Sequence, residues 1–87
     1  LLSNKARVVL IEDEIDVRQR LARTIEAAER LELAGAAGTV SEGRRLLERT
    51  LPEGLLVDLG LPDGRGAELI RAALDLRPDA RGMRTLE

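Results

Sequence analysis

Cysteine, histidine and all aromatic residues are absent from this sequence of 87 residues. Without cysteine, the chain cannot form a disulfide or a metal site built on thiolates. Without histidine, no imidazole can act as a general base, carry a phosphoryl group or bind zinc. Any chemistry of this chain must therefore come from carboxylates, hydroxyls, backbone groups and cations.

The charged residues favour neither sign strongly. Fourteen basic and sixteen acidic residues give a net charge of -2, and the two signs are mixed along the sequence. The chain has no basic stripe for a nucleic-acid backbone and no aromatic platform for bases. It also lacks an apolar run near the roughly 20 residues that span a bilayer, and residues 1–7 do not resemble a signal peptide. We therefore expect a cytoplasmic protein that binds neither nucleic acid nor membrane.

Three apolar segments have the character of strands in one small domain. Val8 to Ile11 and Leu55 to Val57 are short runs that are apolar on both faces, and an acidic residue follows each directly. Such runs suit the central strands of a parallel sheet that helices cover on both faces. Leu31 to Ala37 predicts a weaker strand, because alanine and glycine have low strand propensity.

Three amphipathic segments separate or follow these strands. Apolar residues recur every three or four positions from Asp16 to Ala28 and from Ala67 to Leu76, which predicts a helix in each place. The middle helix is expected to begin at Ser41, whose hydroxyl can cap it, and to break at Leu51 to Gly54. The resulting β-α-β-α-β-α order requires a parallel sheet with right-handed crossovers.

The predicted regular structure stops at Pro78. A further strand is due after this proline, but Arg81 to Arg84 do not have the pattern of one. We therefore expect a partial domain over residues 1–78 and an irregular C-terminal tail over residues 79–87, for which a non-native or read-through origin is one interpretation.

Carboxylates follow two of the three predicted strands. Parallel strands end at one edge of their sheet, and open α/β folds hold their ligands there. If the first and third strands are neighbours, Glu12, Asp13 and Asp58 converge at that edge. Three carboxylates repel one another unless a cation lies among them, and hard oxygen ligands select Mg²⁺ or a similar ion. Such an ion could also bridge to a phosphoryl group and neutralise its charge.

Two motifs of this sequence resemble those of bacterial response-regulator receiver domains. Val-Val-Leu-Ile-Glu-Asp-Glu at 8–14 is similar to the first strand and acidic pair of that family. Leu-Leu-Val-Asp-Leu-Gly-Leu-Pro-Asp-Gly-Arg-Gly at 55–66 is similar to its phosphorylation strand and the loop that follows. The resemblance covers Arg7 to Pro78. It implies a flavodoxin-like, CheY-like parallel sheet flanked by helices, of which this sequence supplies the first three βα units.

The resemblance also implies a role for each residue at the acidic edge. Asp58 would accept phosphate from a sensor histidine kinase or a phosphotransfer protein. Asp13 would bind Mg²⁺ directly, Glu12 would help through water, and the backbone carbonyl of Gly60 would be a further ligand. The chain would then be a two-component signalling module. It would not be a conventional enzyme, since at most it would catalyse its own phosphorylation and dephosphorylation.

This sequence departs from the family's pattern in its second half. A complete receiver has five βα units, with Ser or Thr ending the fourth strand and a phosphate-binding Lys ending the fifth. The only lysine here is Lys5, ahead of the first strand. The alternative function is therefore a truncated or pseudo-receiver that acts only in protein interaction. A third strand left at the edge of the sheet would favour a homodimer through that edge.

A third possible function is that of a phosphatase of the haloacid-dehalogenase type. Such an enzyme would carry a second aspartate two positions after Asp58, but Gly60 stands there.

Several other polar residues have a simpler, structural interpretation. Glu14 and Asp16 suit the N-terminus of the first helix, where the helix dipole favours acids. The arginines of that helix are interpreted as a solvated face, with kinase docking as the alternative.

Overall fold

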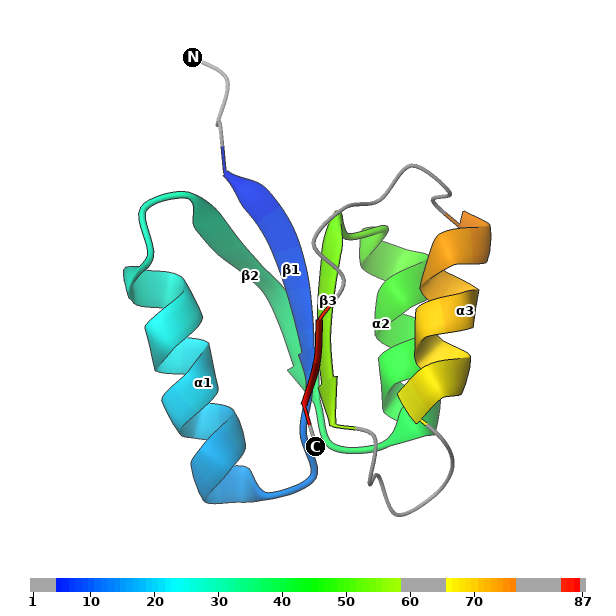
Figure 1. The fold of residues 1–87 in the computed structure, drawn as a ribbon, viewed down its shortest axis with the longest axis horizontal. Coiled ribbons are helices and arrows are strands. Elements are labelled where there is room, and N and C mark those ends of the chain that lie inside the picture. Colours follow the sequence, from blue (N-terminus) through cyan, green and yellow to red (C-terminus); the bar gives the residue numbers. More distant parts are fainter. Residues whose placement is uncertain (1–4, 59–65, 77–83, 87) are drawn as a thin grey trace.

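The computed structural model describes residues 5–58, 66–76 and 84–86. Its elements in chain order are β1 (Ala6–Ile11), α1 (Ile15–Ala27), β2 (Leu31–Ala37), α2 (Val40–Thr50), β3 (Gly54–Asp58), α3 (Gly66–Leu76) and β4 (Arg84–Leu86) (Figure 1). The strands form one parallel sheet in the order β2-β1-β3-β4. This is the start of the flavodoxin-like order, so the predicted fold class is confirmed.

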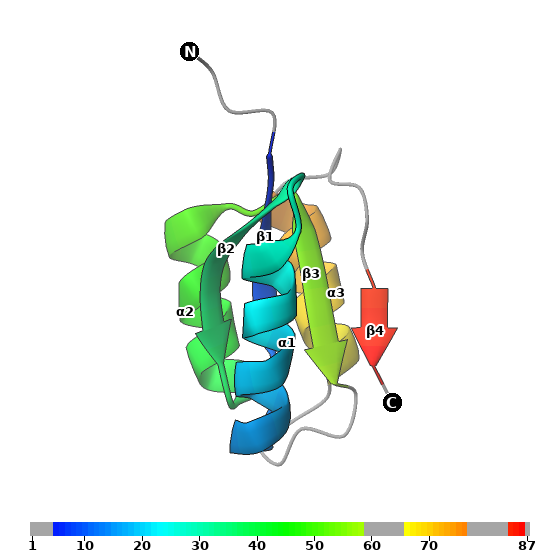
Figure 2. The ribbon, with the colours of Figure 1, turned by 90° about the vertical axis from the view of Figure 1, so that its left-hand side faces the viewer.

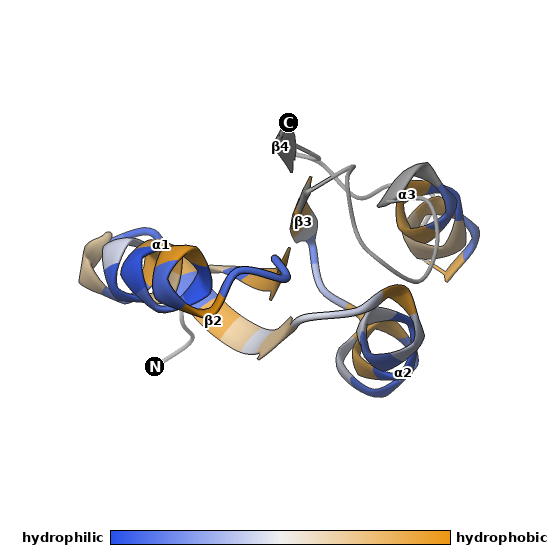
Figure 3. Ribbon diagram, turned by 90° about the horizontal axis from the view of Figure 1, so that it is seen from below, coloured by the Kyte–Doolittle hydropathy of each residue, from blue (hydrophilic) through white to orange (hydrophobic). Residues whose placement is uncertain are grey.

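Helices cover both faces of the sheet. Helix α1 lies on one face, and α2 and α3 lie together on the other (Figures 1 and 3). Val9 and Ile11 belong to the core on the side of α2 and α3, where Leu47 and Leu69 are fully buried. Since successive side chains of a strand point to opposite faces, the buried Leu10 faces α1. The doubly apolar character of this strand thus follows from its central position.

A capping box begins α2. The Thr39 hydroxyl accepts a hydrogen bond from the Glu42 N–H at 3.2 Å, and the Glu42 carboxylate accepts one from the Gly38 N–H at 3.3 Å. These bonds satisfy backbone donors that a helix N-terminus leaves without an internal partner. The prediction that Ser41 caps this helix is therefore wrong, because the cap residue is Thr39.

Helix α2 ends at a residue with left-handed backbone geometry. Leu51 has a φ of 47°, and its N–H donates to the Leu47 carbonyl at 2.9 Å. The following Pro52 cannot extend the helix, so the predicted break at this point is confirmed. A residue with a Cβ atom, such as Leu51, is strained in this backbone conformation, whereas glycine is not.

Strand β4 is the main difference from the predicted structure. Arg84 to Leu86 run parallel to β3, with Leu56 paired to Arg84 and Asp58 paired to Leu86 (Figure 2). The prediction of an irregular segment over residues 79–87 is wrong for these three residues, because pairing with β3 fixes a strand that the local pattern does not indicate. The rest of that segment lies outside the described residues.

The position of β4 also corrects the predicted sheet edge. Strand β3 lies between β1 and β4, so it is not the edge strand of the described sheet. The edge strands there are β2 and β4. The domain boundary at residue 78 stays a prediction. None of the described helices has the length and apolar character that crossing a membrane would require.

Candidate functional site

The ends of β1 and β3 meet at the carboxyl edge of the sheet. These two strands are paired in parallel, and the last pair in their register is Ile11 with Val57. Glu12 and Asp58 are the residues that follow this pair in the two strands. Because neighbouring strands lie about 4.8 Å apart, the backbones of Glu12 and Asp58 are adjacent. The sheet thus provides the neighbouring strand ends on which the predicted acidic site depends.

Glu12 is a buried acid at this edge, with 6% of its surface exposed. Its N–H donates to the Ala37 carbonyl of β2 at 2.9 Å. Its carboxylate atom Oε2 accepts a hydrogen bond from the Glu14 N–H at 3.0 Å. The backbone and the side chain of Glu12 are therefore both held in place, between the end of β2 and the start of α1.

Arg18 fixes the same strand end from α1. Its Nη1 donates to the Glu12 carbonyl at 2.7 Å, and the side chain is half-buried. The guanidinium also lies against Gly38, where an added Cβ would come within 2.8 Å of Nη1. The interpretation of the α1 arginines as a solvated face is therefore wrong for Arg18. Its one sequence signal is its place six positions after Glu12, early in α1.

Of the other predicted site residues, some lie within the described part of the chain and some outside it. The Asp13 side chain is exposed, next to the buried Glu12. Asp58 is the last residue of β3, but its side chain and the whole of Gly60 lie outside the description. Among the side chains that the structure describes, no three acidic groups gather into a metal site.

The residues at this edge fit a hard divalent cation. Glu12 and Asp13 offer carboxylate oxygens, which are the ligands that Mg²⁺ prefers in proteins. Asp13 is open to a hydrated ion, whereas Glu12 already accepts a hydrogen bond through one oxygen. Glu14 is the N-cap residue of α1 without a capping bond from its side chain, and Asp16 lies in the first turn. The first-turn position of Asp16 agrees with its interpretation as an acid at a helix N-terminus.

Two curated proteins similar to this chain are bacterial regulators. The chain is 36% identical over 75 residues to the DNA-binding transcriptional activator DevR/DosR of Mycobacterium tuberculosis. It is 34% identical over 80 residues to the photosynthetic apparatus regulatory protein RegA of Rhodobacter capsulatus. These matches cover 86% and 92% of the chain but 35% and 42% of the relatives, so the chain spans less than half their length. No protein-family model matches the chain.

Solved structures agree in fold. A LuxR-family two-component response regulator from Aurantimonas sp. SI85-9A1 superposes with a TM-score of 0.80 at 30% identity, over 95% of this chain and 60% of that one. The response regulator domain of Thermotoga maritima CheB gives a TM-score of 0.79 over 93% of this chain and 60% of that one. Its sequence is 20% identical to this chain, so this second match supports the fold alone. With its strand order and its acidic strand ends, the chain belongs to the receiver-domain family of two-component response regulators.

Proposed function

We propose that this receiver accepts a phosphoryl group on Asp58, with Mg²⁺ held at the acidic edge by Asp13 and Glu12. The donor would be the phosphohistidine of a sensor histidine kinase or of a phosphotransfer protein. The observation that carries the proposal is the parallel register of β1 and β3, whose last pair immediately precedes Glu12 and Asp58. Membership of the receiver family supports the same assignment.

In the proposed reaction, a carboxylate oxygen of Asp58 forms a bond to phosphorus. The bond between phosphorus and the donor's imidazole nitrogen breaks, its electron pair stays on that nitrogen, and the ring takes up one proton from solvent, so that neutral imidazole leaves. Bound Mg²⁺ would neutralise charge on the phosphoryl oxygens during this transfer. Asp13 has an exposed carboxylate at the edge and would bind the ion directly, together with the Gly60 carbonyl.

Glu12 would act mainly by shaping the site. Its buried carboxylate accepts the Glu14 N–H, and Arg18 holds its carbonyl. These bonds fix the backbone immediately before Asp13. A fixed backbone lowers the entropy that must be lost when Asp13 and its neighbours enclose an ion. Contact between Glu12 and the ion through a water molecule is compatible with this arrangement.

Intact-mass spectrometry after incubation with acetyl phosphate tests the proposal. We expect one added phosphoryl group in the presence of Mg²⁺ and none in the presence of a chelator. Asp58→Asn should abolish the addition, and Asp13→Asn should raise the Mg²⁺ concentration that the addition requires. Asp75→Asn is the matched control, because Asp75 is an exposed acid at the far end of α3. A folded chain that gains no phosphoryl group at saturating Mg²⁺ would favour the alternative, a pseudo-receiver that only binds proteins.

A further inference from the structure

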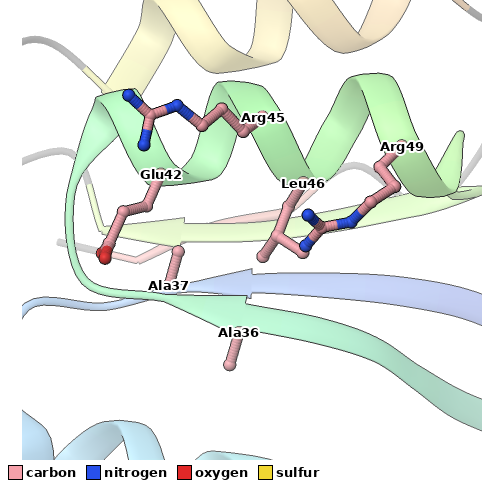
Figure 4. Close-up of a pocket in the computed structure, with 6 residues that line it drawn as sticks. All are labelled: Ala36, Ala37, Glu42, Arg45, Leu46 and Arg49. Atoms are coloured by element: carbon pink, nitrogen blue, oxygen red, sulfur yellow. The ribbon is translucent and has the colours of Figure 1, made fainter.

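A hollow of about 250 Å³ lies between α2 and the edge strand β2. We call it the β2–α2 hollow, and it is lined by Ala36, Ala37, Glu42, Arg45, Leu46 and Arg49 (Figure 4). Of the four helical members, Glu42, Leu46 and Arg49 follow one another at intervals of four and three positions, and Arg45 lies four positions before Arg49, so the four share one side of α2. We propose that this hollow binds an extended acidic peptide segment of a partner protein, laid along the free edge of β2.

The backbone of β2 is available to such a segment. In the described sheet β2 pairs only with β1, so its other side has no strand partner. The Ala37 carbonyl accepts from the Glu12 N–H, so the backbone groups of Ala37 face β1. Backbone groups of successive residues in a strand face opposite sides, and the N–H and carbonyl of Ala36 therefore face the free edge.

The side chains of β2 leave this edge uncovered. Proteins commonly protect edge strands with lysine, proline or inward-pointing charges. The segment from Gly35 to Ala37 has only glycine and alanine, and it pairs regularly with Val9 to Ile11. The irregularity in register lies before it, between Val8 and Val9. An added strand requires an edge with regular backbone geometry and small side chains.

The charge of the hollow selects an acidic partner. The Glu42 carboxylate accepts the Gly38 N–H and the Thr39 hydroxyl, so it is occupied by the capping box. Arg45 and Arg49 are exposed, and the side chain of neither forms a hydrogen bond or ion pair with another residue in the described part of the chain. The two arginines that line the hollow complement carboxylates, which a guanidinium group can bind through two parallel hydrogen bonds.

The proposal does not depend on phosphorylation of Asp58. It is tested by fluorescence anisotropy with a labelled octaglutamate peptide as the acidic probe and an octalysine peptide as the reverse-charge probe. The chain has a net charge of -2, so its overall charge opposes octaglutamate binding. We expect saturable octaglutamate binding that weakens at higher salt, as screened ion pairs do. Labelled octalysine is titrated in a separate sample, and any binding of it should not depend on Arg45 and Arg49.

Two double variants separate the hollow from general charge. Replacing Arg45 and Arg49 by alanine should weaken octaglutamate binding about tenfold, equivalent to the loss of ~1.4 kcal/mol of binding free energy. Replacing Arg20 and Arg23 by alanine removes the same charge from exposed positions of α1 and should leave binding unchanged. Equal losses in the two doubles, or no octaglutamate binding by the unmodified chain, would overturn the proposal.

A backbone variant tests the strand-addition part. Ala36→Pro removes a donor that faces the free edge, and proline is tolerated at such positions of edge strands. We expect this variant to keep its circular dichroism spectrum and urea midpoint while losing octaglutamate affinity. A folded Ala36→Pro chain with full affinity would contradict pairing along β2. Concentration-dependent dimerisation that Ala36→Pro abolishes, without octaglutamate binding, would instead assign the edge to a second copy.

Discussion

Replacing Arg18 by alanine removes the bond that ties α1 to the end of β1. The bond from Arg18 Nη1 to the Glu12 carbonyl is 2.7 Å long and joins a charged donor to the carbonyl of a buried residue. Hydrogen bonds with a charged partner contribute about 1.5–3 kcal/mol to stability. Arg18 is half-buried, so we expect the lower end of this range, ~1.5 kcal/mol. The unfolding equilibrium constant should then rise about tenfold.

Urea unfolding followed by far-ultraviolet circular dichroism measures this change. The chain has no Trp or Tyr, so the assay cannot use their fluorescence. Arg18→Ala should lower the urea midpoint without changing the denaturant slope. Arg20→Ala is the matched control, because Arg20 is an exposed arginine of the same helix. Surface substitutions of that kind usually stay within about 0.5 kcal/mol.

Gly38 provides the decisive comparison for Arg18. An added Cβ at Gly38 would lie 2.8 Å from Arg18 Nη1, so Gly38→Ala must displace the guanidinium. The two substitutions should therefore be coupled, and Gly38→Ala should cost much less in the Arg18→Ala background than alone. Additive costs in this double-mutant cycle, or equal costs for Arg18→Ala and Arg20→Ala, would refute the role assigned to Arg18.

Two further predictions concern the ends of α2. Thr39→Ala should destabilise the chain by about 1 kcal/mol in urea unfolding, because the hydroxyl caps the Glu42 N–H. Thr24→Ala should change stability little, since the Thr24 hydroxyl bonds the Arg20 carbonyl within α1, and equal effects would contradict the capping account. Leu51→Gly should raise the melting temperature, because glycine relieves ~1 kcal/mol of backbone strain in the left-handed conformation of the exposed Leu51. A lower melting temperature would show that the contacts of the Leu51 side chain stabilise the fold by more than this strain costs.

The sequence predicts the parts of the fold that depend on local pattern. β2 is observed over Leu31 to Ala37, as predicted, and β1 and β3 contain the predicted apolar runs. The cap of α2 could also have been predicted, because Thr39 and Glu42 have the spacing of a capping box. Strand β4 could not, since its three residues are fixed by pairing with β3.

For the acidic site as well, the local sequence identifies the residues, but the tertiary structure decides whether they lie together. Acids after two apolar runs indicate a shared edge only if the two strands are neighbours, and the register of β1 with β3 supplies that condition. Arg18 was missed because its contact with the Glu12 carbonyl depends on how α1 packs against the sheet. The one sequence signal of Arg18, its place six positions after Glu12, does not by itself identify such a contact.

Reductive trapping of the phosphorylated chain tests the central claim most directly. Borohydride converts an aspartyl phosphate to homoserine, and peptide sequencing by mass spectrometry then locates the modified residue. After treatment with acetyl phosphate and Mg²⁺, we predict homoserine at position 58 and at no other aspartate. Homoserine at Asp13 or elsewhere, or none at position 58 in a folded chain with saturating Mg²⁺, would contradict the assignment of Asp58 as the phosphoacceptor.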